Sequence, residues 1–171
     1  MPESRQRSRR AIAAAGTAAF LVAVPGVVAG LIPWLLTSWR MDDAPVAVRI
    51  LGGALIAGGA AFLLHAFARF VIEGVGTPAP VAPTERLVVG GVYRHVRNPM
   101  YLAVGATIVG QALFFGEPAL LGYAALFAAI VFSFVRLYEE PALTEQFGES
   151  YEAYRHAVPG WLPRLHPWDG K

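Results

Sequence analysis

Four long stretches of this chain are almost free of charged residues, and they constrain its fold more than any other feature. They run approximately over residues 11–36, 46–72, 99–115 and 118–138. A helix rises ~1.5 Å per residue and the hydrocarbon core of a bilayer is ~30 Å thick, so about 20 apolar residues can cross it. We therefore expect an all-α integral membrane bundle of four transmembrane helices. The last two stretches form a short helical hairpin, and the third is near the lower limit of length and crosses obliquely.

The composition favours lipid as the main solvent. Of the 171 residues, 56% are hydrophobic and only 15% are charged, whereas soluble domains carry about 25% charged residues. Cysteine is absent, which excludes disulfides, zinc–thiolate sites and thiol nucleophiles. The four histidines do not have the spacing of helical metal ligands, so we expect no metal. Basic residues are not interleaved with stacking aromatics, which argues against nucleic-acid binding.

Positive charge is concentrated on one side of the predicted membrane segments. It precedes the first helix, lies between the second and third, and follows the fourth: Arg5, Arg7, Arg9, Arg10, Arg86, Arg94, Arg97, Arg136, Arg155, Arg164 and Lys171. Arg40 and Arg49 fall on the opposite side. By the positive-inside rule, both termini and both ends of the hairpin face the cytoplasm, in an inner or plasma membrane of bacterial type. The first apolar run is too long for a signal peptide and further spans follow it, so we interpret it as a retained anchor.

The sequence predicts a single membrane domain over residues 1–171, in three parts. Residues 1–75 form an N-terminal helix pair, which we expect to pack closely through small residues: Gly26, Gly30, Gly52, Gly53, Gly58 and Gly59. Residues 76–98 form a cytoplasmic connector that begins with a proline-rich, extended path. Residues 99–171 hold the hairpin and then an amphipathic helix at about 142–156, where apolar and aromatic residues recur every three or four positions.

Polar residues and prolines inside the predicted helices are unusual for lipid-facing segments. Pro25 and Pro33 each remove a backbone donor, so we expect them to kink the first helix. His65 lies about two turns inside the second helix, where a polar side chain usually faces the bundle interior. It is therefore a candidate for a pocket wall and for catalysis. Gln111, deep in the third helix, is either its hydrogen-bond partner or a polar contact between helices.

Two polar clusters flank the hairpin. The first surrounds the start of the third helix and contains aromatic and basic residues: Tyr93, Arg94, His95, Arg97, Asn98 and Tyr101. The second is the pair Glu139 and Glu140, about one turn after Arg136. Because residues 102–138 form one hairpin, both clusters must emerge on the same side of the membrane, where they can build one site. Asn98 fits an N-cap, and the free backbone donors beside it suit a polar ligand that carries a planar base. The glutamates either mark the point where the helix reaches water or accept hydrogen bonds from a ligand.

The order of motifs in the second half of the chain resembles a known family. The motifs are Gly91-Val92-Tyr93, Arg97-Asn98-Pro99-Met100-Tyr101, Glu139-Glu140-x-x-Leu143 and Phe147-Gly148-x-x-Tyr151-x-x-Tyr154. Together they resemble the isoprenylcysteine carboxyl methyltransferase and phospholipid methyltransferase superfamily over about residues 87–163. Members are integral membrane enzymes that bind S-adenosylmethionine on the cytoplasmic side and admit a lipid-like acceptor from the bilayer.

The resemblance implies roles for the matching residues. The implied cofactor-binding residues are Leu87, Val88, Tyr93, Asn98, Pro99, Met100, Tyr101, Glu139 and Glu140. Arg136, Arg97 and His65 are the candidates for catalysis. Asn98 replaces the histidine usual in the family. Val135 stands where the eukaryotic prenylcysteine enzymes place a substrate arginine, and Arg136 is one residue along. The implied chemistry is methyl transfer, in which the protein mainly aligns the acceptor with the methyl group and excludes water.

We therefore expect a membrane-embedded S-adenosylmethionine-dependent methyltransferase that acts on a lipid-like or isoprenoid acceptor, by carboxyl O-methylation or phospholipid N-methylation. Its expected partners are the membrane and a lipophilic small-molecule or lipid acceptor from the bilayer, without nucleic acid or metal. One alternative is an NADPH-dependent membrane reductase of the sterol-reductase-like fold, which shares the Arg-x-Pro-x-Tyr helix start. Another is a non-enzymatic membrane protein whose clusters only anchor helix ends. The Glu-Glu and Phe-Gly-x-x-Tyr runs favour the methyltransferase.

Overall fold

The computed structural model describes residues 16, 19, 23–69, 72 and 86–170, and the regular elements in these residues are all helical. In chain order they are the π-helix η1 (Val27–Leu31), α2 (Ile32–Thr37), α3 (Val46–Arg69), the 3₁₀-helix η3 (Gly91–Arg94), α4 (Pro99–Phe115), α5 (Ala119–Phe134), the π-helix η4 (Val135–Glu139), α6 (Glu140–Phe147) and α7 (Glu149–Ala157). The prediction of an all-α fold is confirmed for the described residues.

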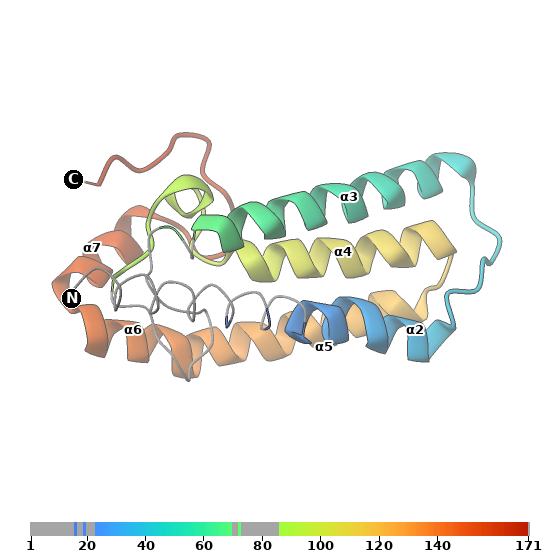
Figure 1. Ribbon diagram of the computed structural model, residues 1–171, viewed down its shortest axis with the longest axis horizontal. Coiled ribbons are helices and arrows are strands. Elements are labelled where there is room, and N and C mark those ends of the chain that lie inside the picture. The colour runs from blue at the N-terminus through green and yellow to red at the C-terminus, as the bar shows by residue number, and fades with distance from the viewer. Residues whose placement is uncertain (1–15, 17–18, 20–22, 70–71, 73–85, 171) are drawn as a thin grey trace, which may run out of the picture.

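The helices form an elongated bundle with two distinct ends. Figure 1 shows α3 beside α4 along the length of the bundle, with α5 and α2 on the other side. The turn between α2 and α3 and the turn between α4 and α5 lie at one end, whereas η3, α6 and α7 gather at the other. We call the second end the polar end, because both predicted polar clusters lie there.

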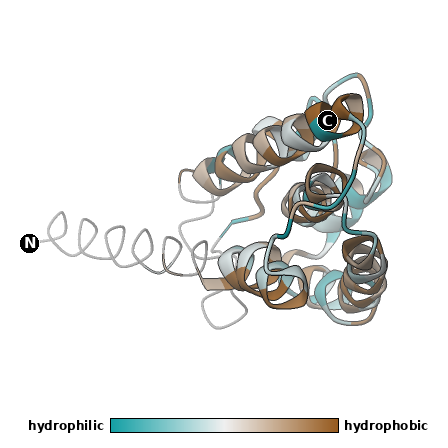
Figure 2. Cartoon of the chain, turned by 90° about the vertical axis from the view of Figure 1, so that its right-hand side faces the viewer, coloured by the Kyte–Doolittle hydropathy of each residue, from teal (hydrophilic) through white to brown (hydrophobic). Residues whose placement is uncertain are grey.

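The outer faces of the bundle are apolar, as lipid requires. Many large apolar side chains are exposed, among them Leu35, Ile50, Leu126 and Ile130, and Figure 2 shows apolar residues around the helices when the bundle is viewed along its length. In the part of the chain that the structure describes, two helices are long and apolar enough to cross a membrane, Val46–Arg69 and the continuous Ala119–Phe147. Ala23–Thr37 and Pro99–Phe115 are shorter apolar helices. The count of four crossings stays a prediction, since much of the first predicted helix lies outside the described residues.

The antiparallel helices α3 and α4 pack with their backbones in direct contact. A Cβ atom added to Gly52 would lie 2.5 Å from the backbone nitrogen of Phe114, and one added to Gly59 would lie 2.8 Å from the carbonyl oxygen of Ala103. Only glycine fits at such distances, because any side chain would collide with main chain that cannot rotate away. The two glycines are seven residues apart, so both face α4 on the same side of α3. We call this contact the α3–α4 seam.

Among the described residues, the glycines do not pair the first two helices, and the expected helix pair over residues 1–75 stays a prediction. A Cβ atom on Gly26, Gly30 or Gly58 would meet no atom of another described segment within 4 Å. Small residues permit close approach but do not identify the partner. Because α3 and α4 both carry glycine at matching levels, these two helices meet each other instead.

The first helix widens into a π turn, η1, ahead of Pro33. In this turn the Ile32 N–H donates to the Val27 carbonyl, five residues back, so the Val28 carbonyl loses its usual donor. The Tyr123 hydroxyl of α5 donates to that carbonyl at 2.8 Å. The helix thus widens just before Pro33, and a neighbouring helix satisfies a carbonyl that lipid cannot solvate. The expected kinks at Pro25 and Pro33 stay predictions.

A second π turn, η4, precedes Pro141 and makes α5, η4 and α6 one continuous helix. The predicted amphipathic helix at 142–156 is consequently wrong as a single element. It divides at Gly148, whose φ of 53° and ψ of −129° are readily adopted only by glycine. The first part of the predicted helix continues the membrane helix as α6, whereas α7 turns back across the polar end.

After α7, residues 158–169 run back along the segment before α4, and we call them the C-terminal strap. The Arg97 N–H donates to the Pro159 carbonyl at 3.0 Å, and the Arg164 N–H donates to the His95 carbonyl at 3.0 Å. These bonds attach the end of the chain to the first polar cluster. The first part of the predicted connector, residues 76–85, lies outside the residues that the structure describes. Its described part, residues 86–98, contains the short helix η3.

Candidate functional site

One cavity at the polar end brings together residues from every predicted cluster. It is lined by all nine residues implied to bind a cofactor and by Arg97: Leu87, Val88, Tyr93, Arg97, Asn98, Pro99, Met100, Tyr101, Glu139 and Glu140. These residues come from the segment before α4, from the first turn of α4, from the end of η4 and from the start of α6. Residues of both predicted clusters therefore lie at the same end of the bundle. We call this space the polar-end cavity.

The closest link between the two clusters is a hydrogen bond across the hairpin. The Tyr101 hydroxyl donates to Glu139 Oε2 at 3.0 Å, although the two residues are 38 positions apart in the sequence. The π turn η4 ends at Glu139, and it lets the consecutive residues Glu139 and Glu140 both reach the cavity wall. Single π turns inside α-helices are frequent at functional sites, because they redirect side chains without ending the helix.

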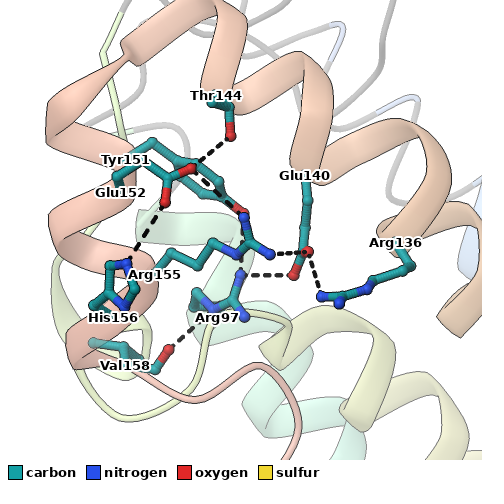
Figure 3. Close-up of polar contacts among 9 residues, drawn as sticks. All are labelled: Arg97, Arg136, Glu140, Thr144, Tyr151, Glu152, Arg155, His156 and Val158. Carbon is teal, nitrogen blue, oxygen red and sulfur yellow. Dashed lines mark hydrogen bonds and ion pairs between the residues drawn. The ribbon is translucent and has the colours of Figure 1, made fainter.

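Glu140 lies at the centre of a group of arginines drawn in Figure 3. Arg97 Nη1 donates to Glu140 Oε1 at 2.9 Å, while Arg136 and Arg155 approach Oε2 at 3.2 and 3.4 Å. The Glu140 side chain is 9% exposed and that of Arg97 is 13% exposed, so this pair is largely shielded from solvent. Removing one member of such a pair leaves a buried charge uncompensated. Glu140 thus holds Arg97 in a fixed position at the cavity.

Asn98 occupies the N-cap position of α4, but its side chain does not cap the helix. The residue is 8% exposed, and its Nδ2 atom has no hydrogen-bond partner among the residues that the structure describes. The expectation of a side-chain cap is therefore wrong. A buried amide nitrogen without a partner is costly, and Asn98 also lines the polar-end cavity. The nitrogen lies beside the C-terminal strap, since a Cβ atom added to Gly160 would lie 3.5 Å from it.

Two tyrosines of α7 close the cavity on the side of the C-terminal strap. Tyr154 donates its hydroxyl proton to the Tyr93 carbonyl at 2.7 Å, and the Tyr151 hydroxyl accepts a bond from Arg97 Nη1 at 3.0 Å. Both rings are almost fully buried. Burial raises the pKa of each phenol, so both remain neutral at physiological pH. These bonds fix α7 against η3 and against the start of α4.

Two candidate residues do not line this cavity. His65 is exposed on α3, and Arg136, whose side chain is 60% exposed, reaches the site only through its ion pair with Glu140. Gln111 is not the partner of His65. Its Nε2 donates to the Ala29 carbonyl at 2.6 Å, while its Oε1 accepts from Trp39 Nε1 at 3.1 Å. Gln111 was expected either to bond to His65 or to make a polar contact between helices, and the second is observed.

Sequence reasoning missed several residues of the site. Tyr151 and Tyr154 line the cavity, and Arg155 completes the arginine group, yet none of them was among the candidates. The aromatic spacing along 142–156 was a usable signal for the two tyrosines, since both belong to the motif that carries the family resemblance. Arg155 offered no comparable signal, because its contact with Glu140 depends on the reversal of the chain at Gly148. Among the described residues, no group of His, Cys, Asp and Glu side chains could hold a metal ion.

Comparison with known proteins identifies the family. A curated relative, the protein-S-isoprenylcysteine O-methyltransferase of Schizosaccharomyces pombe (strain 972 / ATCC 24843), is 32% identical over 82 residues, which are 46% of this chain and 34% of the relative. The chain thus spans about a third of the length of that relative. No solved structure matches the chain. The family model for phospholipid methyltransferases matches residues 47–150, which is more than half of the chain. The resemblance drawn from the motifs is therefore confirmed, and the chain belongs to the phospholipid methyltransferase family.

Proposed function

We propose that this chain is a membrane methyltransferase that uses S-adenosylmethionine and acts on a lipid-like or isoprenoid acceptor. The observation that carries the proposal is the polar-end cavity, where the start of α4 and the glutamates of η4 and α6 meet. The family supports methyl transfer, and the name of the yeast relative supports an isoprenoid acceptor. Carboxyl O-methylation and phospholipid N-methylation are both compatible with this site.

The cavity offers groups that suit each part of S-adenosylmethionine. Leu87, Val88 and Met100 supply an apolar surface for the adenine ring. Glu139 is the candidate acceptor for hydroxyl or ammonium groups of the cofactor, and Asn98, which lines the cavity, is a candidate polar contact. When bound, the cofactor supplies an electrophilic methyl group on a positively charged sulfur.

The protein's part in such a reaction is alignment and exclusion of water. Arg97, held by Glu140 and Tyr151, places a fixed positive charge at the cavity wall. A group fixed by its own hydrogen bonds needs no reorganisation as charge develops. A carboxylate acceptor is nucleophilic when ionised, whereas an amine acceptor must first lose a proton. The aromatic residues of α7 shield the cavity from water on the side of the strap.

A titration of purified protein with S-adenosylmethionine tests the cofactor assignment. We expect wild-type protein to bind it and Glu139→Gln to bind about 10- to 100-fold more weakly, as the loss of a charge-assisted hydrogen bond implies. The glutamine amide oxygen can still accept from Tyr101, so the variant removes charge with little change in shape. Glu149→Gln, at an exposed position on α7, is the matched control and should bind like wild type.

The same titration separates the alternative functions. Equal binding by Glu139→Gln and wild type would remove Glu139 from the proposed site. A rise in melting temperature with NADPH but not with S-adenosylmethionine would support the reductase instead. A response to neither would support a non-enzymatic role. The acceptor class then follows from incubation with radiolabelled S-adenosylmethionine and a total membrane lipid extract, because a labelled ester and a labelled amine differ in their stability to base.

We also propose that the polar end faces the cytoplasm, as the distribution of arginine predicts. The chain contains no cysteine, so single cysteines can be introduced without background. Ser150 on α7 and Asp43 at the opposite end of the bundle are both exposed. In inside-out vesicles, a membrane-impermeant maleimide should label Ser150→Cys and not Asp43→Cys, and right-side-out vesicles should give the reverse. Labelling of both cysteines from one side would contradict the proposed orientation.

A further inference from the structure

A second cavity lies between α4 and α5, and it shares only Tyr101 and Phe127 with the lining of the polar-end cavity. Its volume is about 480 Å³. Small residues of both helices line its middle, among them Gly105 and Ala106 of α4 and Ala124 and Ala128 of α5. Apart from the Tyr101 hydroxyl and the indole nitrogen of Trp161, the side chains that line it are apolar. We call this space the hairpin groove, because α4 and α5 form the helical hairpin.

The hairpin groove adjoins the polar-end cavity directly. Tyr101 and Phe127 line both spaces, so these two side chains form the partition between them. On the groove side the partition is apolar. On the cavity side, the Tyr101 hydroxyl is bonded to Glu139 at 3.0 Å. A molecule in the groove with one end at Tyr101 therefore lies beside the proposed methyl-transfer site.

The other boundary of the groove is aromatic and belongs partly to the C-terminal strap. Phe132 of α5 and Trp161 of the strap face each other with ring centroids 5.9 Å apart. Tryptophan is common where an apolar segment meets the membrane surface, since its ring is amphipathic. Phe132 is 55% exposed, so the groove opens past this side chain toward the surroundings of the bundle.

From this arrangement we infer that the hairpin groove binds the hydrocarbon chain of the methyl acceptor, with the reacting end of the acceptor at Tyr101. The inference rests on the proposed function. An alkyl or isoprenyl chain requires no hydrogen bonds, so it suits walls that offer almost none. It also gains free energy from burial against apolar side chains that line a preformed space. The partition shared with the polar-end cavity favours the acceptor's own chain over a helix of another protein, because a helix would have no reason to end at Tyr101.

Gly105 offers a direct way to fill the groove. A Cβ atom there would lie 3.7 Å from the Phe127 ring, which is ordinary contact, so a longer side chain can extend into the open space. Gly105→Leu is therefore the test variant. Gly122→Leu is the matched control, since it makes the same change on α5 at an exposed position with no described atom within 4 Å of the added Cβ.

The probe is a 16-carbon fatty acid that carries a diazirine in its chain, added to the full-length protein in lipid nanodiscs and activated by light. We expect mass spectrometry to locate adducts on groove-lining residues of α4 and α5. Gly105→Leu should reduce these adducts at least fivefold, and Gly122→Leu should leave them unchanged. Equal adducts in both variants, adducts only on outward-facing residues, or crosslinks between two copies of the chain would overturn the inference.

A second measurement separates this inference from the proposed function. S-adenosylmethionine binding should be the same in Gly105→Leu as in wild type, whereas methylation of the lipid extract should fall at least tenfold. If wild-type protein does not bind S-adenosylmethionine, the proposed function fails, and with it the claim that the bound chain belongs to a methyl acceptor. If the cofactor binds to Gly105→Leu and methylation is unchanged, the groove assignment fails while the proposed function stands.

Discussion

The α3–α4 seam and the hairpin groove are built from the same kinds of residue, yet they have opposite structures. In the seam, Gly52 and Gly59 face the backbone of α4 so closely that an added Cβ would collide with it. In the groove, Gly105 and Ala128 face a space of about 480 Å³. Both helix pairs are antiparallel and both consist largely of apolar residues.

The difference shows what small residues do in a membrane bundle. Lipid tails are as apolar as the side chains, so helices associate mainly through packing and polar contacts. When small residues on both helices lie at the same level, the backbones meet and the contact gains dispersion energy. When another contact already holds the two helices apart, the same residues leave a space. In this bundle the aromatic partition of Tyr101 and Phe127 stands between the polar-end cavity and the groove.

The largest effect should come from adding one carbon to the seam. Gly52→Ala would place its Cβ 2.5 Å from the Phe114 backbone nitrogen, so α3 and α4 must move apart. We expect the free energy of unfolding in detergent micelles to fall by about 3 kcal/mol, the upper part of the usual range for overpacking. Gly58→Ala, on the same helix with no described neighbour near its added Cβ, is the control. A smaller loss at Gly52 than at Gly58 would mean that the seam is not closely packed.

A smaller loss of stability should follow when a polar contact between helices is removed. Gln111 joins α4 to the first helix and to the turn after α2, through the Ala29 carbonyl and the Trp39 indole. Gln111→Leu keeps the volume but leaves that carbonyl and that N–H without partners. We expect a loss of about 2 kcal/mol, measured by thermal unfolding in the same micelles. If the loss is negligible, water or another donor satisfies these groups and the first helix is held in another way.

The arrangement of the site could be predicted from the sequence because hairpin length constrains it. Residues 102–138 are apolar over a length that allows two crossings, so Tyr101 and Glu139 had to emerge together. The fine structure could not be predicted in the same way. Pro33 and Pro141 each lack the backbone N–H that would bond to a carbonyl one turn earlier. Which carbonyl is left without a donor depends on where the helix widens into a π turn, and neighbouring helices decide that position.

The errors have a similar physical origin. Asn98 has the sequence context of a capping residue, but its side chain makes no capping bond. Its amide nitrogen lies beside Gly160 of the C-terminal strap, a contact that no local pattern reports. The division of the C-terminal helix at Gly148 depends on α7 packing against η3, a contact between residues far apart in the chain. Local signals therefore identified the helices and the motifs, whereas partners and helix breaks were decided by tertiary contacts.

A single hydrogen bond between α5 and the first helix should have a modest effect. The Tyr123 hydroxyl donates to the Val28 carbonyl, which has no donor within its own helix because of the π turn. Tyr123→Phe removes this donor and retains the ring, so we expect a loss of about 1 kcal/mol in thermal unfolding. The double variant with Gln111→Leu should lose more than the sum of the two single losses if both bonds hold the same helix. Simple additivity would show that the two contacts act independently.

The smallest change in stability is expected in the hairpin groove, and it should be a gain where the α3–α4 seam shows a loss. Gly105→Ala makes the same chemical change as Gly52→Ala, but its Cβ would lie 3.7 Å from the Phe127 ring, at ordinary contact distance. Because alanine restricts the unfolded chain and favours the helix, we expect stability to rise by about 0.5 kcal/mol. Gly122→Ala, which is exposed on α5, measures the helix preference without the groove. A loss at Gly105 similar to that at Gly52 would mean that α4 and α5 pack directly, in which case the space between them could not accept a hydrocarbon chain.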